Sequence, residues 1–350
     1  MPPTRAASSA PVSWRSASAS RVSRSRGSSS GRWRVSALGS NDAGIRHDRA
    51  RRVFVAGATG VVGRRLTPAL RDAGLEVRAL VREPADAEGL PAGVEPVVGD
   101  VLDPGVVELA HGSDVIVHTA SAVPDRRPAP SEAWARNDRI RRQGTRNLVN
   151  AAREVGAQML LQSVTLLYAD AGERWIDASN ARLRPSENLV SMVEAERMAE
   201  GSGITSLILR QGLLFGSDAG ASRDLLDAVR RQSLPPISDQ QVWLPLLDPG
   251  DFAAMAVSAL DQGLTGTYDT VSDVATINEL IERAAALSSV EPPEPVPLEE
   301  ARAALGPALF ATWYRSRRVT SSALEAHGIT GTSSWQQMLD SADTHAASSS

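Results

Sequence analysis

Residues 53–63 read VFVAGATGVVG, a short apolar run that gives way to three glycines at Gly57, Gly60 and Gly63. The run is typical of a buried parallel strand, and a helix is expected after it over 61–73. Gly57 would allow the tight turn, Gly60 would let backbone amides approach a pyrophosphate, and Gly63 would let helix and sheet pack closely. The helix start would offer free N–H groups and a partial positive charge to phosphates. This stretch predicts a dinucleotide site; a glycine turn without a ligand is the alternative.

Strand and helix patterns alternate along the chain after this stretch. Apolar runs predict further strands at residues 77–81, 97–98, 115–117, 159–161 and 207–209. Longer periodic segments predict helices over 137–155 and 191–200. The alternation indicates an α/β fold, a doubly wound parallel Rossmann sheet followed by a small C-terminal substrate lobe. Pro68 should weaken or bend the first helix.

Changes in composition mark the expected domains. Residues 1–50 form an Arg/Ser-rich segment with few acids, which cannot bury enough apolar surface to fold, so we expect disorder. A transit peptide and a start assigned too far upstream are further interpretations of this segment. The Rossmann domain is expected over 51–216 and the lobe over most of 217–340, with 341–350 as a frayed tail. The lobe should close over the carboxyl edge of the sheet, with helices near 222–232, 251–261 and 276–288.

The composition is that of an ordinary globular protein, with 42% apolar and 22% charged residues and a net charge of −4. The absence of Cys excludes disulfides, zinc thiolates and a cysteine nucleophile, and the five His show no metal-ligand spacing, so no metal is expected. All 37 basic residues are Arg, so no mechanism that needs a lysine can operate. No apolar run approaches the ~20 residues that span a bilayer. We therefore expect a cytoplasmic protein that acts on a small molecule, with neither nucleic acid nor a membrane as partner; a homodimer stays open.

The residues after the second strand bear on the choice of cofactor. NAD sites usually place Asp or Glu there to hold the ribose 2′-hydroxyl. Here the strand ends at Val81 and Arg82 follows, and an Arg can pair with the 2′-phosphate of NADP. Arg64, just after the third glycine, is a second candidate contact. Glu83 would restore an acid if the alignment shifted by one residue, but NADP(H) is favoured over NAD(H).

From about residue 51 to 335 the chain resembles the extended or atypical short-chain dehydrogenase/reductase superfamily, the NAD-dependent epimerase/dehydratase type. The supporting segments are VGDVLD at 98–103, VIVHTAS at 115–121, GTRNL at 144–148, RQGLLFG at 210–216 and DPGDFA at 248–253. The resemblance implies cofactor contacts along the glycine loop and the following strand ends. The expected contacts are Gly57, Thr59, Gly60, Val61, Val62, Gly63, Arg64, Arg82, Asp100, Val101, Thr119 and Ala120.

The acid–base residues of that superfamily are missing here. Its members use a Tyr-x-x-x-Lys pair with a Ser or Thr. Residues 194–197 resemble the segment after the Lys, which places Asn188 at the Tyr position and Met192 at the Lys position. Neither side chain can donate a proton to the reaction. The strand end SVTLLY at 163–168 places Val164 at the serine position, and Thr165 fits only after a one-residue slip.

Several side chains remain candidates for the site, each with packing as the alternative. Candidates for catalysis are Thr165, Tyr168, Ser163 and Asn188. Candidates for substrate contact are His118, Met192, Trp175, Gln211 and Trp243, the two Trp because flat apolar ligands could stack on them. The pairs Arg126–Arg127 and Arg141–Arg142 could meet an anionic substrate, although most such pairs are solvated.

Three functions fit these observations. The favoured one is an NADP-dependent reductase of a small, secondary-metabolite-like substrate such as a conjugated enone or quinone. Its proton would come from water, Thr165, Tyr168 or His118. The second is a non-redox isomerase, dehydratase or cyclase on the same fold, and the third is a nucleotide-sensing protein without catalysis.

Overall fold

The computed structural model describes residues 51–124 and 131–348. The N-terminal segment over 1–50 and the pair Arg126–Arg127 lie outside the described residues. Within the described part, no helix combines the length and apolarity needed to cross a membrane.

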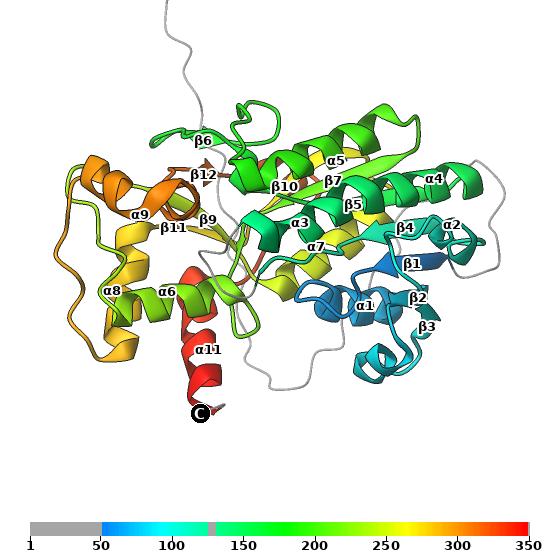
Figure 1. Ribbon diagram of the computed structural model, residues 1–350, viewed down its shortest axis with the longest axis horizontal. Coiled ribbons are helices and arrows are strands. Elements are labelled where there is room, and N and C mark those ends of the chain that lie inside the picture. Colours follow the sequence, from blue (N-terminus) through cyan, green and yellow to red (C-terminus); the bar gives the residue numbers. More distant parts are fainter. Residues whose placement is uncertain (1–50, 125–130, 349–350) are drawn as a thin grey trace, which may run out of the picture. The chain divides into compact units, whose positions relative to one another are not determined.

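The main sheet has seven parallel strands in the order β10-β7-β5-β4-β1-β2-β3 (Figure 1). The chain leaves β1 first toward β2 and β3, and then returns to the other side of β1 for the remaining strands. This reversal between β1 and β4 opens a crevice at the carboxyl ends of the strands. The strands are β1 (Arg52–Ala56), β2 (Glu76–Val81), β3 (Glu95–Val98), β4 (Val115–His118), β5 (Gln158–Val164), β7 (Ser206–Gln211) and β10 (Gly266–Thr270).

Helices cover both faces of this sheet, as the doubly wound fold requires. Val53 and Val55 of β1 pack toward α1 (Gly63–Asp72) and α7 (Pro249–Asp261), whereas Phe54 and Ala56 pack toward the opposite helix layer. That opposite layer contains α2 (Val106–Leu109), α3 (Ser131–Arg139), α4 (Thr145–Val155) and α5 (Val190–Gly201). α1 continues through Pro68, the residue expected to weaken or bend it.

The helix expected over 137–155 is interrupted by a π-helical turn. α3 passes into η2 (Ile140–Gly144), whose wider turn precedes α4. One extra residue per turn rotates the side chains relative to a regular helix, and such turns are frequent at functional sites. Arg141, within this turn, is buried with 6% of its surface exposed.

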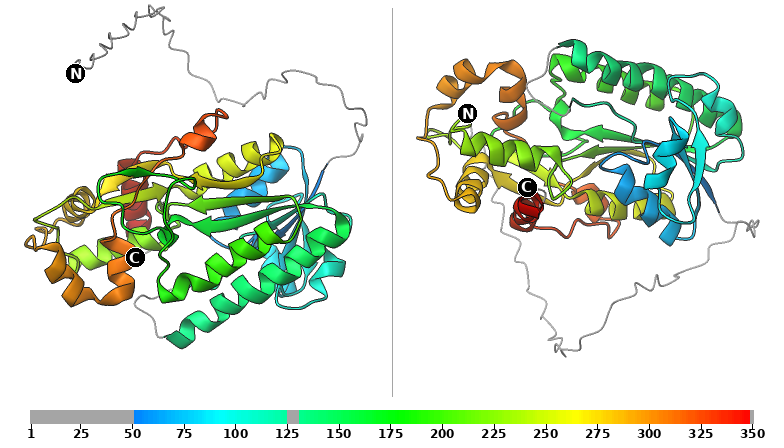
Figure 2. Two further views of the ribbon diagram at one scale, coloured as in Figure 1. Left: turned by 90° about the horizontal axis from the view of Figure 1, so that it is seen from above. Right: turned by 60° about the horizontal axis from the view of Figure 1, so that its bottom comes forward.

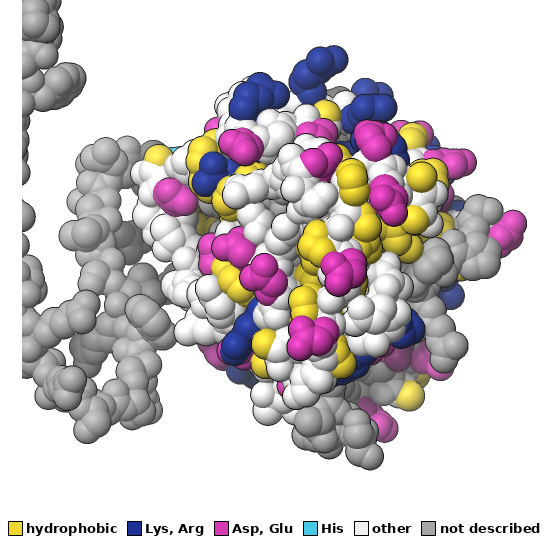
Figure 3. All heavy atoms as spheres, turned by 90° about the vertical axis from the view of Figure 1, so that its left-hand side faces the viewer, with side chains coloured by type: hydrophobic (Ala, Val, Ile, Leu, Met, Phe, Trp, Pro, Cys, Tyr) yellow, Lys and Arg dark blue, Asp and Glu magenta, His cyan; other side chains and the backbone are white. Residues whose placement is uncertain are grey.

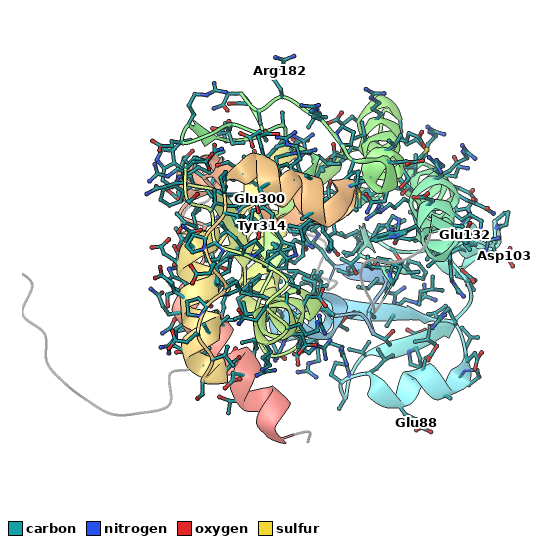
Figure 4. All side chains as sticks on the ribbon, turned by 60° about the vertical axis from the view of Figure 1, so that its left-hand side comes forward. Glu88, Asp103, Glu132, Arg182, Glu300 and Tyr314 are labelled. Carbon is teal, nitrogen blue, oxygen red and sulfur yellow. The ribbon has the colours of Figure 1, made fainter. Side chains whose placement is uncertain are left out.

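A second apolar core holds the C-terminal lobe together. Its strands are β8 (Leu213–Leu214), β9 (Trp243–Leu247) and β11 (Asp273–Thr276), and its helices are α6 (Gly220–Arg230), α8 (Ile277–Ser288), α9 (Leu298–Trp313) and α11 (Trp335–Ser348). Tyr314, just after α9, lies inside the lobe, whereas Glu300 on α9 points outward (Figure 4). The Tyr314 hydroxyl donates a 2.6 Å hydrogen bond to the carbonyl of Pro235. The outer face of the lobe mixes acidic and apolar side chains, as an ordinary exposed surface does (Figure 3).

Shorter elements complete the described chain. They are η1 (Pro84–Gly89), η3 (Thr165–Leu167), η4 (Glu187–Leu189), α10 (Ser322–Glu325) and the two-stranded pair β6 (Trp175–Ile176) with β12 (Arg318–Val319).

Part of the chain after the expected boundary at residue 216 does not belong to the lobe. α7 packs beside α1, and β10 is the edge strand of the main sheet, so residues 249–270 return from the lobe to the Rossmann layers. Asp248 caps α7 by accepting a 2.7 Å hydrogen bond from the Gly250 N–H. The tail also differs from the expectation, because residues 341–348 belong to helix α11.

Candidate active site

A cavity of about 720 Å³ lies at the carboxyl edge of the main sheet. Its lining comes from the glycine loop, the ends of β2, β4, β5 and β7, and helices α6 and α9 of the lobe. Figure 2 shows the lobe helices gathered at one end of the main sheet. The cavity has the size of a typical cofactor or substrate site.

The glycine loop forms one wall, and two of its glycines, Gly57 and Gly63, have no room for a side chain. Gly57 has φ +98, and a Cβ there would lie 2.4 Å from the Ala120 nitrogen. A Cβ on Gly63 would lie 2.0 Å from the Gly57 oxygen, so Gly63 lets α1 pack closely against the loop. A Cβ on Gly60 would meet only the Gly57 oxygen, at 3.4 Å, and Gly60 itself lines the cavity. This cradle beside a helix start fits a pyrophosphate.

The ends of β2 and β3 form the next part of the wall. Arg82 lines the cavity, is exposed and has no hydrogen-bond or ion-pair partner among the described residues. Asp86 lines the same end, and its Oδ2 accepts a 3.3 Å hydrogen bond from the Glu83 N–H. Two expected contacts, Gly63 and the exposed Arg64 of α1, are not part of the lining.

The expected cofactor residues thus gather around one cavity. Asp100 lines it, and its Oδ1 accepts from the Leu102 N–H at 2.9 Å. Thr119 also lines it, with its hydroxyl donating to the Ala56 carbonyl at 3.1 Å. The structure brings these residues together at the cavity: Gly57, Thr59, Gly60, Val61, Val62, Arg82, Asp100, Val101, Thr119 and Ala120. Their arrangement fits a dinucleotide running from the β2–β3 ends to the β4 end.

The hydroxyl groups at the end of β5 and the start of η3 do not line the cavity. Leu161, Gln162 and Val164 line it, whereas Ser163 and Thr165 are buried outside the lining. The Ser163 hydroxyl donates to Glu196 at 2.5 Å, and the Thr165 hydroxyl donates to the Gln211 carbonyl at 3.1 Å. The geometry therefore opposes a catalytic role for either hydroxyl and leaves Val164 at the serine position.

Tyr168 is fully buried instead of lying at the cavity mouth. Its hydroxyl donates to Asp269 at 2.6 Å and accepts from Arg210 at 3.2 Å. Arg210 also forms a buried ion pair with Glu196 at 2.8 Å. Burial raises the pKa of Tyr168 well above its ordinary value, and the charge of Asp269 acts in the same direction. Tyr168 thus belongs to a buried polar network and is poorly placed to donate a proton in the cavity.

The positions of the missing Tyr and Lys do lie at the cavity. Asn188 and Met192 both line it. The Asn188 side-chain oxygen accepts a 2.8 Å hydrogen bond from the Ser186 hydroxyl. Leu189, also in the lining, continues the same wall. This wall contains no titratable group where the superfamily has its proton donor.

His118 and Gln211 line the cavity as expected. Burial lowers the pKa of His118 to about 4, and the charge of Arg141 acts in the same direction, so the imidazole is neutral at pH 7. Its Nδ1 has no hydrogen-bond partner in the described chain. Gln211 accepts a 2.8 Å hydrogen bond from the side chain of Gln162.

The two expected aromatic contacts lie elsewhere. Trp175 and Trp243 do not line the cavity but enclose Arg318 from both sides. The guanidinium carbon of Arg318 lies 4.3 Å from the Trp175 ring centre and 4.0 Å from the Trp243 ring centre. These rings therefore pack the region where β12, β6 and β9 meet, a role that accounts for both without a substrate.

Sequence reasoning missed several residues of the lining. Gln162, Trp134 and Arg223 were not singled out, nor was the contribution of α9 through Leu309 and Thr312. Gln162 had a usable signal, because it alternates with Val164 along an identified strand. Away from the cavity, the exposed groups Glu108, His111 and Glu154 gather at the surface. Both ring nitrogens of His111 already lie within 3.4 Å of a carboxylate oxygen.

Comparison with known proteins agrees with this geometry. Residues 57–241 match a family described as NAD(P)H-binding. The 3-diazoavenalumate denitrifying reductase of a Streptomyces species is 33% identical over 286 residues, which cover 77% of this chain and 90% of that protein. The ceramide reductase of Caulobacter vibrioides is 29% identical over 245 residues, covering 69% of this chain and 71% of that protein.

Solved structures show the same fold. The Bordetella bronchiseptica enzyme WbmG in complex with NAD superposes with a TM-score of 0.67 at 21% identity, covering 87% of this chain and 96% of the other. The architecture, a parallel Rossmann sheet with a small C-terminal lobe, is therefore that of an established dinucleotide-binding fold.

Proposed function

The chain belongs to the NAD(P)H-binding family, and from that premise we propose that it is an NADP-dependent reductase of a small organic substrate. It would be an extended short-chain dehydrogenase/reductase that works without the usual Tyr–Lys pair. The observation that carries this proposal is the single cavity that joins the glycine loop to a chamber bounded by Val164, Asn188 and Met192. Cofactor and substrate would share this space.

Arg82 supports the preference for NADP. It lines the β2 end of the cavity, and no acid among the described residues neutralises it. A guanidinium can bind a phosphate through two parallel hydrogen bonds, so Arg82 would hold the 2′-phosphate. Asp86 lies at the same end, and its Oδ2 already accepts a hydrogen bond from the Glu83 N–H. If the cofactor were NAD, Asp86 would be the residue to hold the ribose hydroxyl.

The chamber beyond the glycine loop supports reduction of an activated substrate. When bound, NADPH supplies a hydride. Val164 and Met192 provide apolar walls that exclude water, and Gln162 and Gln211 provide amide groups that can orient a substrate oxygen. His118 is neutral and buried, and no Tyr or Lys reaches the cavity. A conjugated enone or a quinone suits this site, because its reduced oxygen can take a proton from water.

The relatives support the same class of reaction. Both curated relatives carry the name reductase, one for 3-diazoavenalumate and one for ceramide. Their named substrates differ widely, which fits a conserved cofactor end and a variable chamber. We therefore place the substrate of this chain among small organic molecules, secondary metabolites included.

Calorimetric titration of the full chain with NADPH, NADP, NADH and NAD tests the proposal. We expect tight binding of the phosphorylated pair, followed by oxidation of NADPH in the presence of an enone or quinone. Arg82→Ala should weaken NADPH about 10- to 100-fold and leave NADH nearly unchanged. Arg64→Ala is the matched control, because Arg64 is exposed on α1 outside the cavity. If none of the four nucleotides binds, the reductase assignment fails and a non-redox enzyme takes its place.

A further inference from the structure

We infer that the substrate carries a carboxylate, and that Arg141 binds it inside the cavity. The inference rests on the proposed function, since it names the substrate class of the same site. Arg141 lies in the π-helical turn η2 and lines the cavity. Its sequence neighbour Arg142 is exposed and pairs with Glu194 at the surface, so the two adjacent arginines have different environments.

Among the described residues, Arg141 is a buried cation with no ion-pair partner, and the charge of Asp138 is the one that acts on it. Only 6% of its surface is exposed, its Nη1 donates to the Asn188 carbonyl at 2.9 Å, and its Nε has no partner in the described chain. The nearby carboxylate of Asp138 accepts from the Ser191 hydroxyl at 2.6 Å and lies 3.8 Å from Arg142. Burying an unpaired charge is costly, and a bound anion would offset that cost.

Arg141 lies at the reacting end of the cavity. Its backbone acceptor, Asn188, occupies the position of the missing Tyr. Its charge also acts on His118 at the end of β4. The turn that carries Arg141 belongs to the helix layer opposite α1, so it is separate from the glycine loop that would take the pyrophosphate. The cation therefore faces the substrate end.

The other charges along the lining favour an anion at this end. Arg136 and Arg223 also line the cavity, are exposed and have no ion-pair partner among the described residues. The only acids of the lining, Asp86 and Asp100, follow β2 and β3, and neither forms an ion pair with Arg141. Two arginines near the surface and one buried arginine would attract an organic anion and bind its carboxylate in a bidentate fork.

The test compares carboxylates with their uncharged isosteres. Benzoate, 3-phenylpropanoate and cinnamate, each with its primary amide, are titrated into the full chain with and without saturating NADP. The proteins are wild type, Arg141→Met, Arg141→Lys and Arg142→Met. We expect wild type to prefer carboxylate over amide at least about tenfold. Arg141→Met should remove that preference, Arg141→Lys should restore part of it, and Arg142→Met should keep it in full.

Two results would overturn the inference. The first is equal affinity of wild type for carboxylates and amides, or no carboxylate binding up to about 10 mM. The second is an Arg141→Met protein that melts normally and keeps the carboxylate preference but binds NADPH weakly, which would assign Arg141 to the cofactor ribose. Titrations without nucleotide separate this inference from the proposed function. If the chain preferred carboxylates but bound no NADP, the proposed reductase function would be wrong and the inferred anion site would stand.

Discussion

The phenolic hydroxyl of Tyr168 donates a 2.6 Å hydrogen bond to Oδ1 of Asp269, a residue of β10 that lies 101 positions further along the chain. This bond joins the segment after β5 to the edge strand of the main sheet. Arg210 of β7 donates to the same hydroxyl at 3.2 Å and also donates to the buried Glu196. It therefore connects Tyr168 and Asp269 to Glu196. Tyr168, a candidate for proton transfer by its residue type, therefore has its hydroxyl bound in a buried hydrogen-bond network.

Tyr168→Phe should lower the free energy of unfolding by about 1–3 kcal/mol, because it removes the hydroxyl that donates to the buried Asp269. The affinity for NADPH should stay unchanged, since Tyr168 does not line the cavity. Urea denaturation and calorimetry measure the two quantities. Tyr268→Phe is the control, because Tyr268 is half-buried on the same strand as Asp269. If Tyr168→Phe lost turnover but kept the stability of wild type, Tyr168 would have a role in the reaction.

Asp269 should make the protein less stable as the pH rises from about 4 to 7. Burial raises the pKa of its carboxyl from 3.8 to about 7, against the opposing hydrogen bond from Tyr168 and charge of Arg210. The folded state therefore holds a proton that the unfolded state has lost in this interval, and stability falls by a few kcal/mol across the interval. Above about pH 7 this group adds no further slope.

Comparison of wild type with Asp269→Asn isolates this effect. His118 acts in the opposite direction, because its pKa is lowered to about 4 and its contribution is lost as the pH falls below 6.5. Both proteins contain His118, so the difference between their stabilities across pH 4–7 reports Asp269 alone. A difference that stays constant with pH would contradict the raised pKa.

The sequence identified most residues that line the glycine-loop part of the cavity and fewer of those that line the rest. The glycine loop is a local pattern, and its turn, strand and helix follow from adjacent residues. The partners that hold the Ser163 and Thr165 hydroxyls were not available, because Glu196 and Gln211 belong to the separate elements α5 and β7. The buried environment of Tyr168 was not available, because its partner Asp269 belongs to a strand that the sequence pattern did not identify.

The inward position of Arg141 shows a second limit. A regular helix over 137–155 would continue with 3.6 residues per turn, whereas the π-helical turn at Ile140–Gly144 changes the register by a residue. Side-chain direction after such a turn cannot be read from periodicity. The two Trp residues show a third limit, because Arg318, which lies between their rings, is remote from both in sequence.

Gly63→Ala should be strongly destabilising and should abolish binding of NADPH. The new Cβ would lie 2.0 Å from the Gly57 oxygen and 2.7 Å from the Ala58 backbone, so α1 and the glycine loop would have to separate. Such overpacking costs about 1–3 kcal/mol or more. Gly201→Ala is the control, because no atom lies within 4 Å of its added Cβ. Normal NADPH affinity in Gly63→Ala would show that close packing at this position is dispensable for the site.

Arg318→Ala should weaken the lobe and leave the cavity unaffected. Its guanidinium lies between the rings of Trp175 and Trp243, and each cation–π contact contributes about 0.5–2 kcal/mol. Loss of the side chain should lower the unfolding free energy by about 1–3 kcal/mol and shift tryptophan emission to the red, because Trp175 is already 52% exposed. Affinity for NADPH and for a substrate should not change, since neither Trp lines the cavity. Arg302→Ala is a matched control, because Arg302 stacks on Phe310 and contacts no Trp ring in the described chain. If Arg318→Ala unfolded like wild type but bound substrate more weakly, the two Trp rings would be part of the substrate site.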